Sequence, residues 1–391
     1  MRITDIRELS VPLQGNIANA LVNFSEHTVS LVAVFTDVVR NGKPVIGLAF
    51  DSIGRYAQGG ILRERIIPRV MTAATASPGS LLDAAGTGFD IAKLLQVMLR
   101  NEKPGGHGDR AAAIGALELA FWDLNAKLND EPAWRTIARH FGSEPAVQGV
   151  HVYAAGGYYY PNDTTARLRD EFRAYQDLGF NAFKMKIGGA TLAEDMARIE
   201  AALTVAGSGQ QLAVDANGRF DLATALAYAR AIEPYGLRWY EEIGDPLDYD
   251  LNRRVVESYA GPVATGENLF SVPDVNNLLL FGGMRPGHDV FQMDAGLSYG
   301  LGEYVRMLNA MEVRGFSRGD AHPHGGHLIN LHIAVGLGLG GCEAYPGVFQ
   351  PFGGYPAGCA VGGGLVKPTG APGFGLEEKI ELEESIRNLT N

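Results

Sequence analysis

The sequence predicts an α/β protein in which an N-terminal α+β unit precedes a closed barrel of parallel strands. Two observations lead to this fold class. From about residue 148 to residue 345, short apolar strand-like runs alternate with amphipathic helical stretches, whereas the first 145 residues place strands before helices. Repeated β–α units of this length indicate a parallel sheet, and eight of them favour closure into a barrel.

The N-terminal unit opens with strands. Residues 29–39 and 45–50 are rich in β-branched and apolar residues, and an Asn-Gly-Lys-Pro turn signal at 41–44 separates them. Residues 56–142 then turn helical, with apolar residues at helical spacing over 111–128. Strands followed by helices indicate an α+β arrangement.

The second unit is expected to carry eight strands, separated almost everywhere by helical stretches. They are residues 150–155, 182–187, 211–216, 238–241, 263–266, 290–294, 319–324 and 342–345. The tail after about residue 356 is rich in Gly and Pro and ends in a charged stretch at 376–387. We expect this tail to leave the barrel and to pack back on the N-terminal unit.

The amino-acid composition and net charge of the chain argue against some kinds of binding partner. The 391 residues carry a net charge of −11, with 46% hydrophobic and 20% charged residues. An acidic globular chain argues against a nucleic-acid-binding face and against adhesion to an anionic membrane. Neither Cys342 nor Cys359 lies in a CxxC pair, and neither the N-terminus nor residues 328–341 offer a signal peptide or a membrane span. We therefore expect a soluble cytoplasmic protein.

Chemically active residues stand at successive strand ends. They are Lys186, Asp215, Glu241, Glu267, Asp294 and His324, and each gap between neighbours is one β–α unit long. Because successive parallel strands of a barrel end on the same face, these side chains are predicted to converge on one mouth.

Asp215, Glu241 and Glu267 form a predicted metal site. Three crowded carboxylates repel one another and raise each other's pKa, and a divalent cation removes that conflict. Oxygen-only ligands favour Mg²⁺. Taken singly, each acid is explained as well by a helix cap or an exposed loop. Three of them in register make that reading the weaker one.

Lys184 and Lys186 form a KxK pair on one strand, with the apolar residues Phe183, Met185 and Ile187 around them. Side chains two apart share a face, so both ammonium groups are expected to point into the barrel. Two adjacent cations near a metal depress each other's pKa, which would free one of the two lysines as a base near neutral pH.

His322, His324 and His327 allow two interpretations. An HxH pair at a strand end is compatible with a zinc hydrolase, although no nearby Cys or carboxylate clearly completes such a site. We favour His324 as a general acid oriented by Asp294, since a carboxylate on one ring nitrogen fixes the tautomer and raises basicity. The other two histidines are expected to be structural.

The ordered motifs resemble the enolase superfamily, in its mandelate racemase-like branch, and within it the D-tartrate dehydratases. They are KMK (184–186), VDANG (214–218), WYEE (239–242), TGEN (265–268), QMD (292–294) and HPHGGH (322–327). The likeness extends over NEKPGGHG (101–108), VYAAGGYYYP (152–161), RPGHDVFQ (285–292) and FQPFGGYP (349–356).

This resemblance implies an α+β capping domain (residues 1–145), a modified (β/α)₇β TIM-type barrel (146–355) and a C-terminal segment (356–391) packing on the cap. It implies Mg²⁺ on the three carboxylates, Lys186 as the base, Lys184 as its electrostatic partner and a His324–Asp294 acid dyad. It further implies substrate contacts at Glu343, Asn19, Lys103 and Tyr160. One departure stands out: Ile53 occupies the place of an Asn in the dehydratase loop.

The expected reaction is dehydration of an acid sugar or hydroxy-diacid, with D-tartrate giving oxaloacetate. The rival readings are a racemase or epimerase of a 2-hydroxy acid that uses the same two bases, the zinc hydrolase, and a non-catalytic binding protein. By resemblance the chain is also expected to form a homo-oligomer.

Overall fold

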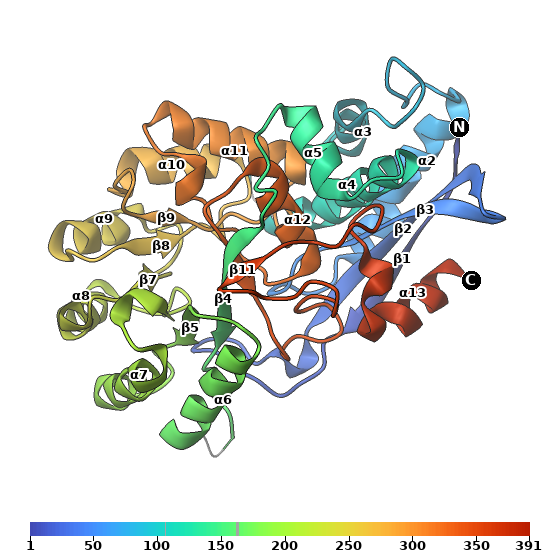
Figure 1. Cartoon of the computed structure of the whole chain (residues 1–391). Helices are drawn as coiled ribbons and strands as arrows, with labels where there is room; N and C mark the ends of the chain where they lie inside the picture. The colour runs from blue at the N-terminus through green and yellow to red at the C-terminus, as the bar shows by residue number, and fades with distance from the viewer. Residues whose placement is uncertain (106, 162–163) are drawn as a thin grey trace.

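The N-terminal part of the chain forms an antiparallel sheet in the order β1-β2-β3 (Figure 1). Its strands are β1 (Ile3–Pro12), β2 (Thr28–Arg40) and β3 (Lys43–Phe50). Asn41 and Gly42, with φ of 53° and 76°, make the tight turn between β2 and β3. This confirms the two strands and the turn predicted for this region. The computed structural model describes residues 1–105, 107–161 and 164–391.

Helices follow this sheet, some of them packed on its strands and the others on neighbouring helices. They are α1 (Gly59–Ile61), α2 (Ile67–Ala76), α3 (Ile91–Met98), α4 (Gly108–Leu128) and α5 (Ala133–Phe141). The long helix α4 packs on β3 so closely that a Cβ at Gly47 would lie 2.2 Å from the carbonyl oxygen of Ala120. The helix predicted at 111–128 is therefore present and begins three residues earlier.

The second sheet is parallel and curled, with the strand order β10-β4-β5-β6-β7-β8-β9 (Figure 1). Its strands are β4 (Val150–Gly156), β5 (Phe183–Lys186), β6 (Leu212–Asp215), β7 (Tyr240–Glu241), β8 (Val263–Thr265), β9 (Val290–Phe291) and β10 (Cys342–Ala344). The helices around it are α6 (Thr165–Asp177), α7 (Leu192–Ala206), α8 (Leu222–Ile232), α9 (Tyr249–Ser258), α10 (Val272–Phe281), α11 (Leu301–Val313) and α12 (Leu328–Leu337). The predicted parallel β/α architecture is confirmed.

The strand predicted at 319–324 is only partly formed. A short 3₁₀ turn occupies Arg318–Asp320, and Ala321 then makes a single parallel bridge to Phe291. The amides of His322 and His324 still donate to the carbonyls of Phe291 and Gln292, at 2.8 and 3.3 Å. Pro323 lacks an N–H group, so the segment cannot complete a regular ladder.

The C-terminal tail contacts both parts of the molecule. The short strand β11 (Leu365–Val366) pairs antiparallel with β4 of the barrel. Helix α13 (Glu383–Thr390) then packs against β1 and β2, where the guanidinium of Arg7 donates to the carbonyl of Leu389 at 3.2 Å.

A buried carboxylate joins the cap to the barrel. Glu118 of α4 is fully buried and accepts hydrogen bonds from the amides of Leu301 and Gly302, the first residues of α11, at 2.9 and 3.1 Å. The indole N–H of Trp122 also donates to it, at 3.0 Å. The first amides of a helix have no partner within that helix, so this contact satisfies two of them and fixes α4 against α11.

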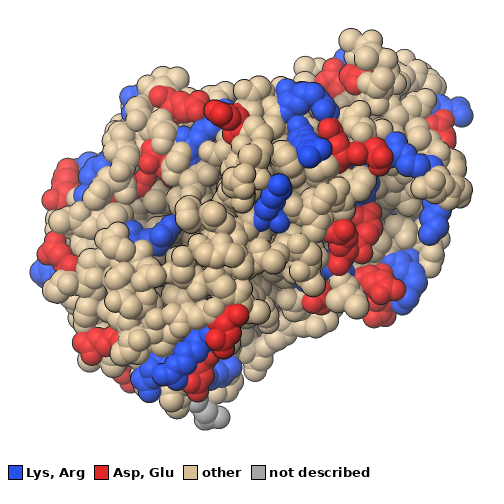
Figure 2. Space-filling view, viewed as in Figure 1, with Lys and Arg blue, Asp and Glu red and all other residues tan. Residues whose placement is uncertain are grey.

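Charged side chains of both signs lie on the surface (Figure 2). Acidic and basic side chains are interspersed on the face shown in Figure 2 rather than segregated by sign. Among the described residues, no helix combines the length and the hydropathy that crossing a membrane requires.

Candidate active site

The register of the parallel sheet brings the predicted acids together. Lys186 pairs with Asp215 across β5 and β6, and Asp215 pairs with Glu241 across β6 and β7. Glu267 follows the end of β8. One ligand atom from each of Asp215, Glu241 and Glu267 lies within 4.8 Å of the others. The spacing of the sequence therefore predicts the cluster correctly.

The chemistry of this cluster fits a small divalent cation. All three carboxylates are buried, and burial together with the charge of Asp215 raises the pKa of Glu241 to about 8. Burial also opposes ionisation of Asp215, but the neighbouring Lys186 and Lys184 hold its pKa below the usual range. Three buried carboxylates repel one another when they are all ionised, and a bound cation offsets that repulsion. Because all the ligand atoms are oxygens, the site is suited to Mg²⁺.

The two lysines point into the acid cluster. Lys186 Nζ lies 2.5 Å from Asp215 Oδ2. Lys184 Nζ forms an ion pair with Glu241 and lies 2.7 Å from Glu343 Oε1. The carbonyl of Lys186 is also held, because Arg198 donates to it at 2.8 Å. Both ammonium groups face inward, as the KxK pattern predicts.

The protein groups by themselves, without a cation on the three carboxylates, raise the pKa of both lysines. Burial lowers the pKa of Lys186, and Lys184 lowers it further, but the opposing charges of Asp215, Glu241 and Glu267 leave it raised. The pKa of Lys184 is also raised, because Glu241 and Glu343 outweigh its burial. The depressed lysine pKa expected from the sequence included a nearby metal ion, so it stays a prediction.

His324 and Asp294 form the expected pair. His324 Nδ1 lies 3.0 Å from Asp294 Oδ2, and its other ring nitrogen lies 3.2 Å from the Tyr345 hydroxyl. Burial lowers the pKa of His324, but the charges of Glu267 and Asp294 raise it to about 9. His324 is therefore protonated at neutral pH and able to donate a proton toward the cavity.

The other two histidines differ in environment. Burial lowers the pKa of His322 to about 3 and that of His327 to about 4, so both are neutral. His322 packs against Trp239, whereas His327 caps the start of α12. Among the described residues, the three carboxylates are the one group able to hold a metal ion. The histidines do not assemble the site that a zinc hydrolase would need.

A cap residue is inserted beside the dyad. The hydroxyl of Ser52, which follows β3, lies 2.9 Å from His327 Nε2 and hydrogen bonds the carboxylate of Asp294. A Cβ at Gly325 would lie 2.5 Å from Ser52 Oγ and 2.8 Å from Asp294 Oδ2, and one at Gly296 would lie 3.0 Å from the Ser52 Cβ. Two glycines of the barrel thus leave the room that Ser52 occupies.

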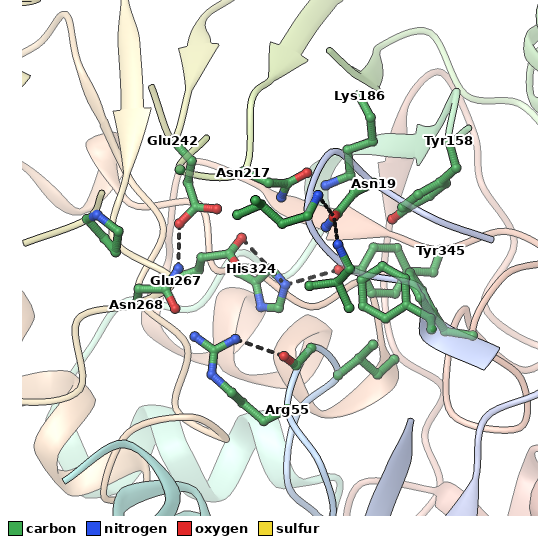
Figure 3. A pocket seen from close by; sticks show the side chains of 18 of the residues that line it. Asn19, Arg55, Tyr158, Lys186, Asn217, Glu242, Glu267, Asn268, His324 and Tyr345 are labelled. Atoms are coloured by element: carbon green, nitrogen blue, oxygen red, sulfur yellow. Dashed lines mark hydrogen bonds and ion pairs between the residues drawn. The ribbon is translucent and has the colours of Figure 1, made fainter. Parts of the chain in front are cut away.

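Cap and barrel enclose one cavity of about 280 Å³ at this mouth (Figure 3). The barrel supplies Tyr158, Lys186, Asn217, Gly218, Glu242, Asp245, Pro246, Glu267, Asn268, His324, Tyr345 and Phe349, and the cap supplies Asn19, Leu21, Val22, Phe24, Ile53, Gly54 and Arg55. The buried Ile53 thus forms part of the apolar wall.

The predicted substrate contacts are only partly at the cavity. Asn19 lines it, but its carboxamide oxygen accepts from the amides of Leu21 and Val22 at 2.8 and 2.7 Å. Lys103 is exposed and does not line it. The Tyr160 hydroxyl instead donates to Glu171 at 3.1 Å. Glu343 does not line the cavity. Its Oε1 pairs with Lys184, and its Oε2 accepts from the amide of Gly325 at 2.9 Å.

Several lining residues were not predicted. Tyr158 takes the place expected for Tyr160, with its ring centroid 5.3 Å from Lys186 Nζ. Glu242 directly follows Glu241, and because successive side chains of a strand point to opposite faces, it would be expected to point away from the barrel mouth. Its φ of 42° instead turns it toward the cavity, where Asn268 donates to it at 2.5 Å. The doubled glutamate of WYEE was the available signal. Arg55 carried no signal beyond its charge.

The fold is that of the enolase superfamily. The family model described as Enolase C-terminal domain-like matches residues 167–381, more than half of the chain. The chain therefore belongs to this superfamily, in its mandelate racemase-like branch.

Particular relatives sharpen the comparison. The chain is 30% identical to an arabinonate dehydratase of Saccharolobus solfataricus over 60% of this chain, and 26% identical to an L-talarate/galactarate dehydratase of Salmonella typhimurium over 64% of it. In each case the match spans 60% of the relative's own length. A racemase from Streptomyces coelicolor, solved with bound magnesium, has the same fold, with a TM-score of 0.78, 24% identity and 99% of both chains covered.

Proposed function

We propose that this protein is a Mg²⁺-dependent dehydratase of 2,3-dihydroxy acids, that is, of an acid sugar or hydroxy-diacid, with D-tartrate as the first substrate to test. The observation that carries the proposal is the placement of Lys186 and His324 on one cavity beside the cluster of three carboxylates. Relatives named as acid-sugar dehydratases support the reaction class. The likeness to tartrate dehydratases in the motifs quoted above supports the particular substrate.

The metal has a defined place in this proposal. Asp215, Glu241 and Glu267 would hold Mg²⁺, which when bound supplies electrostatic stabilisation of negative charge on the substrate carboxylate. The charges that raise the pKa of Lys186 belong to these same carboxylates. A cation held there would offset those charges, so it would lower that pKa and favour Lys186 as a base.

The protein side chains divide the proton transfers between them. Lys186 removes the proton from the carbon next to the substrate carboxylate, and the ammonium of Lys184 helps to stabilise the resulting ene-diolate. His324, held by Asp294, gives a proton to the departing β-hydroxyl, which leaves as water. The remaining enol tautomerises to a 2-keto acid, which for D-tartrate is oxaloacetate.

A racemase or epimerase is the second candidate, because Lys186 and His324 both reach the cavity and could act as two bases on the same carbon acid. The fate of the β-hydroxyl separates the two reactions. Solvent deuterium appearing in recovered substrate without formation of keto acid would favour the racemase.

The test is a panel of acid sugars and hydroxy-diacids incubated with the protein and Mg²⁺, with keto acid measured as its semicarbazone. We expect D-tartrate to give oxaloacetate, and EDTA to abolish the reaction until Mg²⁺ is restored. Calorimetry should show that Asp215→Asn weakens Mg²⁺ binding. Absence of keto acid from every member of the panel would refute the proposal.

A further inference from the structure

We propose that Arg55 of the cap recognises a second carboxylate at the far end of the substrate, so that the enzyme selects aldarates, with an acid group at each end, over aldonates, with one. This inference rests on the proposed function and specifies its substrate class.

Arg55 provides an unused cationic group at the cavity. It is the only arginine among the described residues that line this cavity, and it forms no ion pair with a described carboxylate. Its guanidinium donates one hydrogen bond, to the carbonyl of Gly54 at 2.8 Å, and lies 5.8 Å from the centre of the Phe270 ring. A guanidinium carries five N–H donors in a fork that matches a carboxylate. Most of that donor capacity is therefore open to a ligand.

The loop that carries Arg55 is held firmly. Asp51 accepts from the amide of Ser30 at 2.7 Å, Ser52 is locked between His327 and Asp294, and Ile53 is buried. Gly54 has a φ of +107°. Such an anchored loop presents the guanidinium at a defined place, which reduces the entropy lost when a ligand binds.

The loop that carries Arg55 lies next to His324, and this position determines which part of a bound substrate faces each side chain. A Cβ at Gly54 would lie 3.8 Å from His324 Cε1, so the loop passes directly over the imidazole that protonates the β-hydroxyl. In Figure 3, Lys186 and Arg55 lie at opposite ends of the cavity, with His324 and Glu267 between them. A substrate whose α-carbon faces Lys186 and whose β-hydroxyl faces His324 therefore extends its remaining carbons toward Arg55.

Two apolar neighbours of Arg55 add to the selectivity of its charge. Ile53 and Phe270 flank Arg55 and offer no hydrogen bond to a hydroxymethyl terminus. A terminal carboxylate gains a charge-assisted pair with the guanidinium, whereas a terminal CH₂OH gains at most a neutral hydrogen bond. We expect a preference of about tenfold to a hundredfold for the two-ended acid, the range for a hydrogen bond to a charged group.

The first test compares matched substrates that differ only at the terminus: tartrate with threonate, and galactarate with galactonate. In the wild type, kcat/KM should favour each diacid by about tenfold or more. Arg55→Gln should remove most of that preference by raising KM for the diacid alone, and Arg55→Lys should retain part of it. The control Arg173→Gln, on the surface of α6, removes the same charge and should leave the ratio unchanged.

A second test separates this inference from the proposed reaction. Malate and 2,4-dihydroxybutyrate differ in the same way at the terminus, carboxylate against CH₂OH, and neither has the 2,3-diol whose dehydration gives a 2-keto acid. Calorimetry with Mg²⁺ should show tighter binding of malate to the wild type and loss of the difference in Arg55→Gln. If the binding ratio changes in this way but no acid is dehydrated, the reaction is wrong and the role of Arg55 stands. A wild type without preference for the diacid, or a preference that survives Arg55→Gln, would overturn the inference.

Discussion

Ser52→Ala would test whether the cap helps to hold the acid dyad in place. The substitution deletes a buried hydroxyl that hydrogen bonds His327 Nε2 at 2.9 Å and the carboxylate of Asp294. A lost hydrogen bond to a charged group costs about 1.5–3 kcal/mol. Because Asp294 in turn holds the ring of His324 at 3.0 Å, part of that loss reaches the general acid.

We therefore expect Ser52→Ala to lower the free energy of unfolding by about 2–3 kcal/mol and kcat by about tenfold to a hundredfold, with KM changed less than about twofold. Urea unfolding and steady-state keto-acid formation measure the two effects. Ser258→Ala, which removes a hydroxyl from the surface of α9, is the matched control and should change neither. A variant that loses stability yet keeps its kcat within about twofold would show that Ser52 only joins the domains, and the coupling argued here would be refuted.

The remaining predictions concern the base, the turn beside the dyad and the buried carboxylate of the cap. Lys186→Ala should abolish both keto-acid formation and exchange of the α-proton with D₂O, whereas His324→Asn should retain exchange. Retained exchange in the lysine variant would remove Lys186 from its role. Gly325→Ala should reduce kcat strongly, because its Cβ would meet Ser52 and Asp294 and because its φ of +87° disfavours alanine; wild-type turnover would contradict this. Burial raises the pKa of Glu118 from 4.5 to about 7, so the folded state holds a proton that the unfolded chain has released. Stability from this group is complete below pH 4.5 and is lost as the pH rises through about 7. The unfolding free energy of the wild type relative to Glu118→Gln should thus fall by about 3 kcal/mol across that window, and a constant difference in urea titrations would count against the shift.

Sequence reasoning succeeds where one repeating unit controls position. The even distance between successive strand ends predicts that Asp215, Glu241 and Glu267 meet, because a parallel sheet offers few other arrangements. The KxK alternation likewise directs Lys184 and Lys186 inward. Neither inference needs knowledge of the loops.

It fails where backbone geometry departs from the repeat or where charges must be summed in three dimensions. Pro323 interrupts a strand that the apolar pattern suggested, and the positive φ of Glu242 turns a side chain that alternation would hide. The pKa of Lys186 depends on carboxylates from several strands, whose joint effect no local pattern contains. Arg55 belongs to the cap, and only its docking on the barrel places it beside His324.

Ser52 packs against Gly296 and Gly325, and this contact limits which caps and barrels of related proteins can be combined in one functional chain. A hybrid whose first 145 residues came from another member would need a small hydroxyl-bearing residue at position 52. A foreign barrel bearing any side chain at positions 296 or 325 would push that segment away. Recombination at the boundary between cap and barrel is therefore tolerated only when both halves already share this contact, so the two halves are expected to be inherited as one unit.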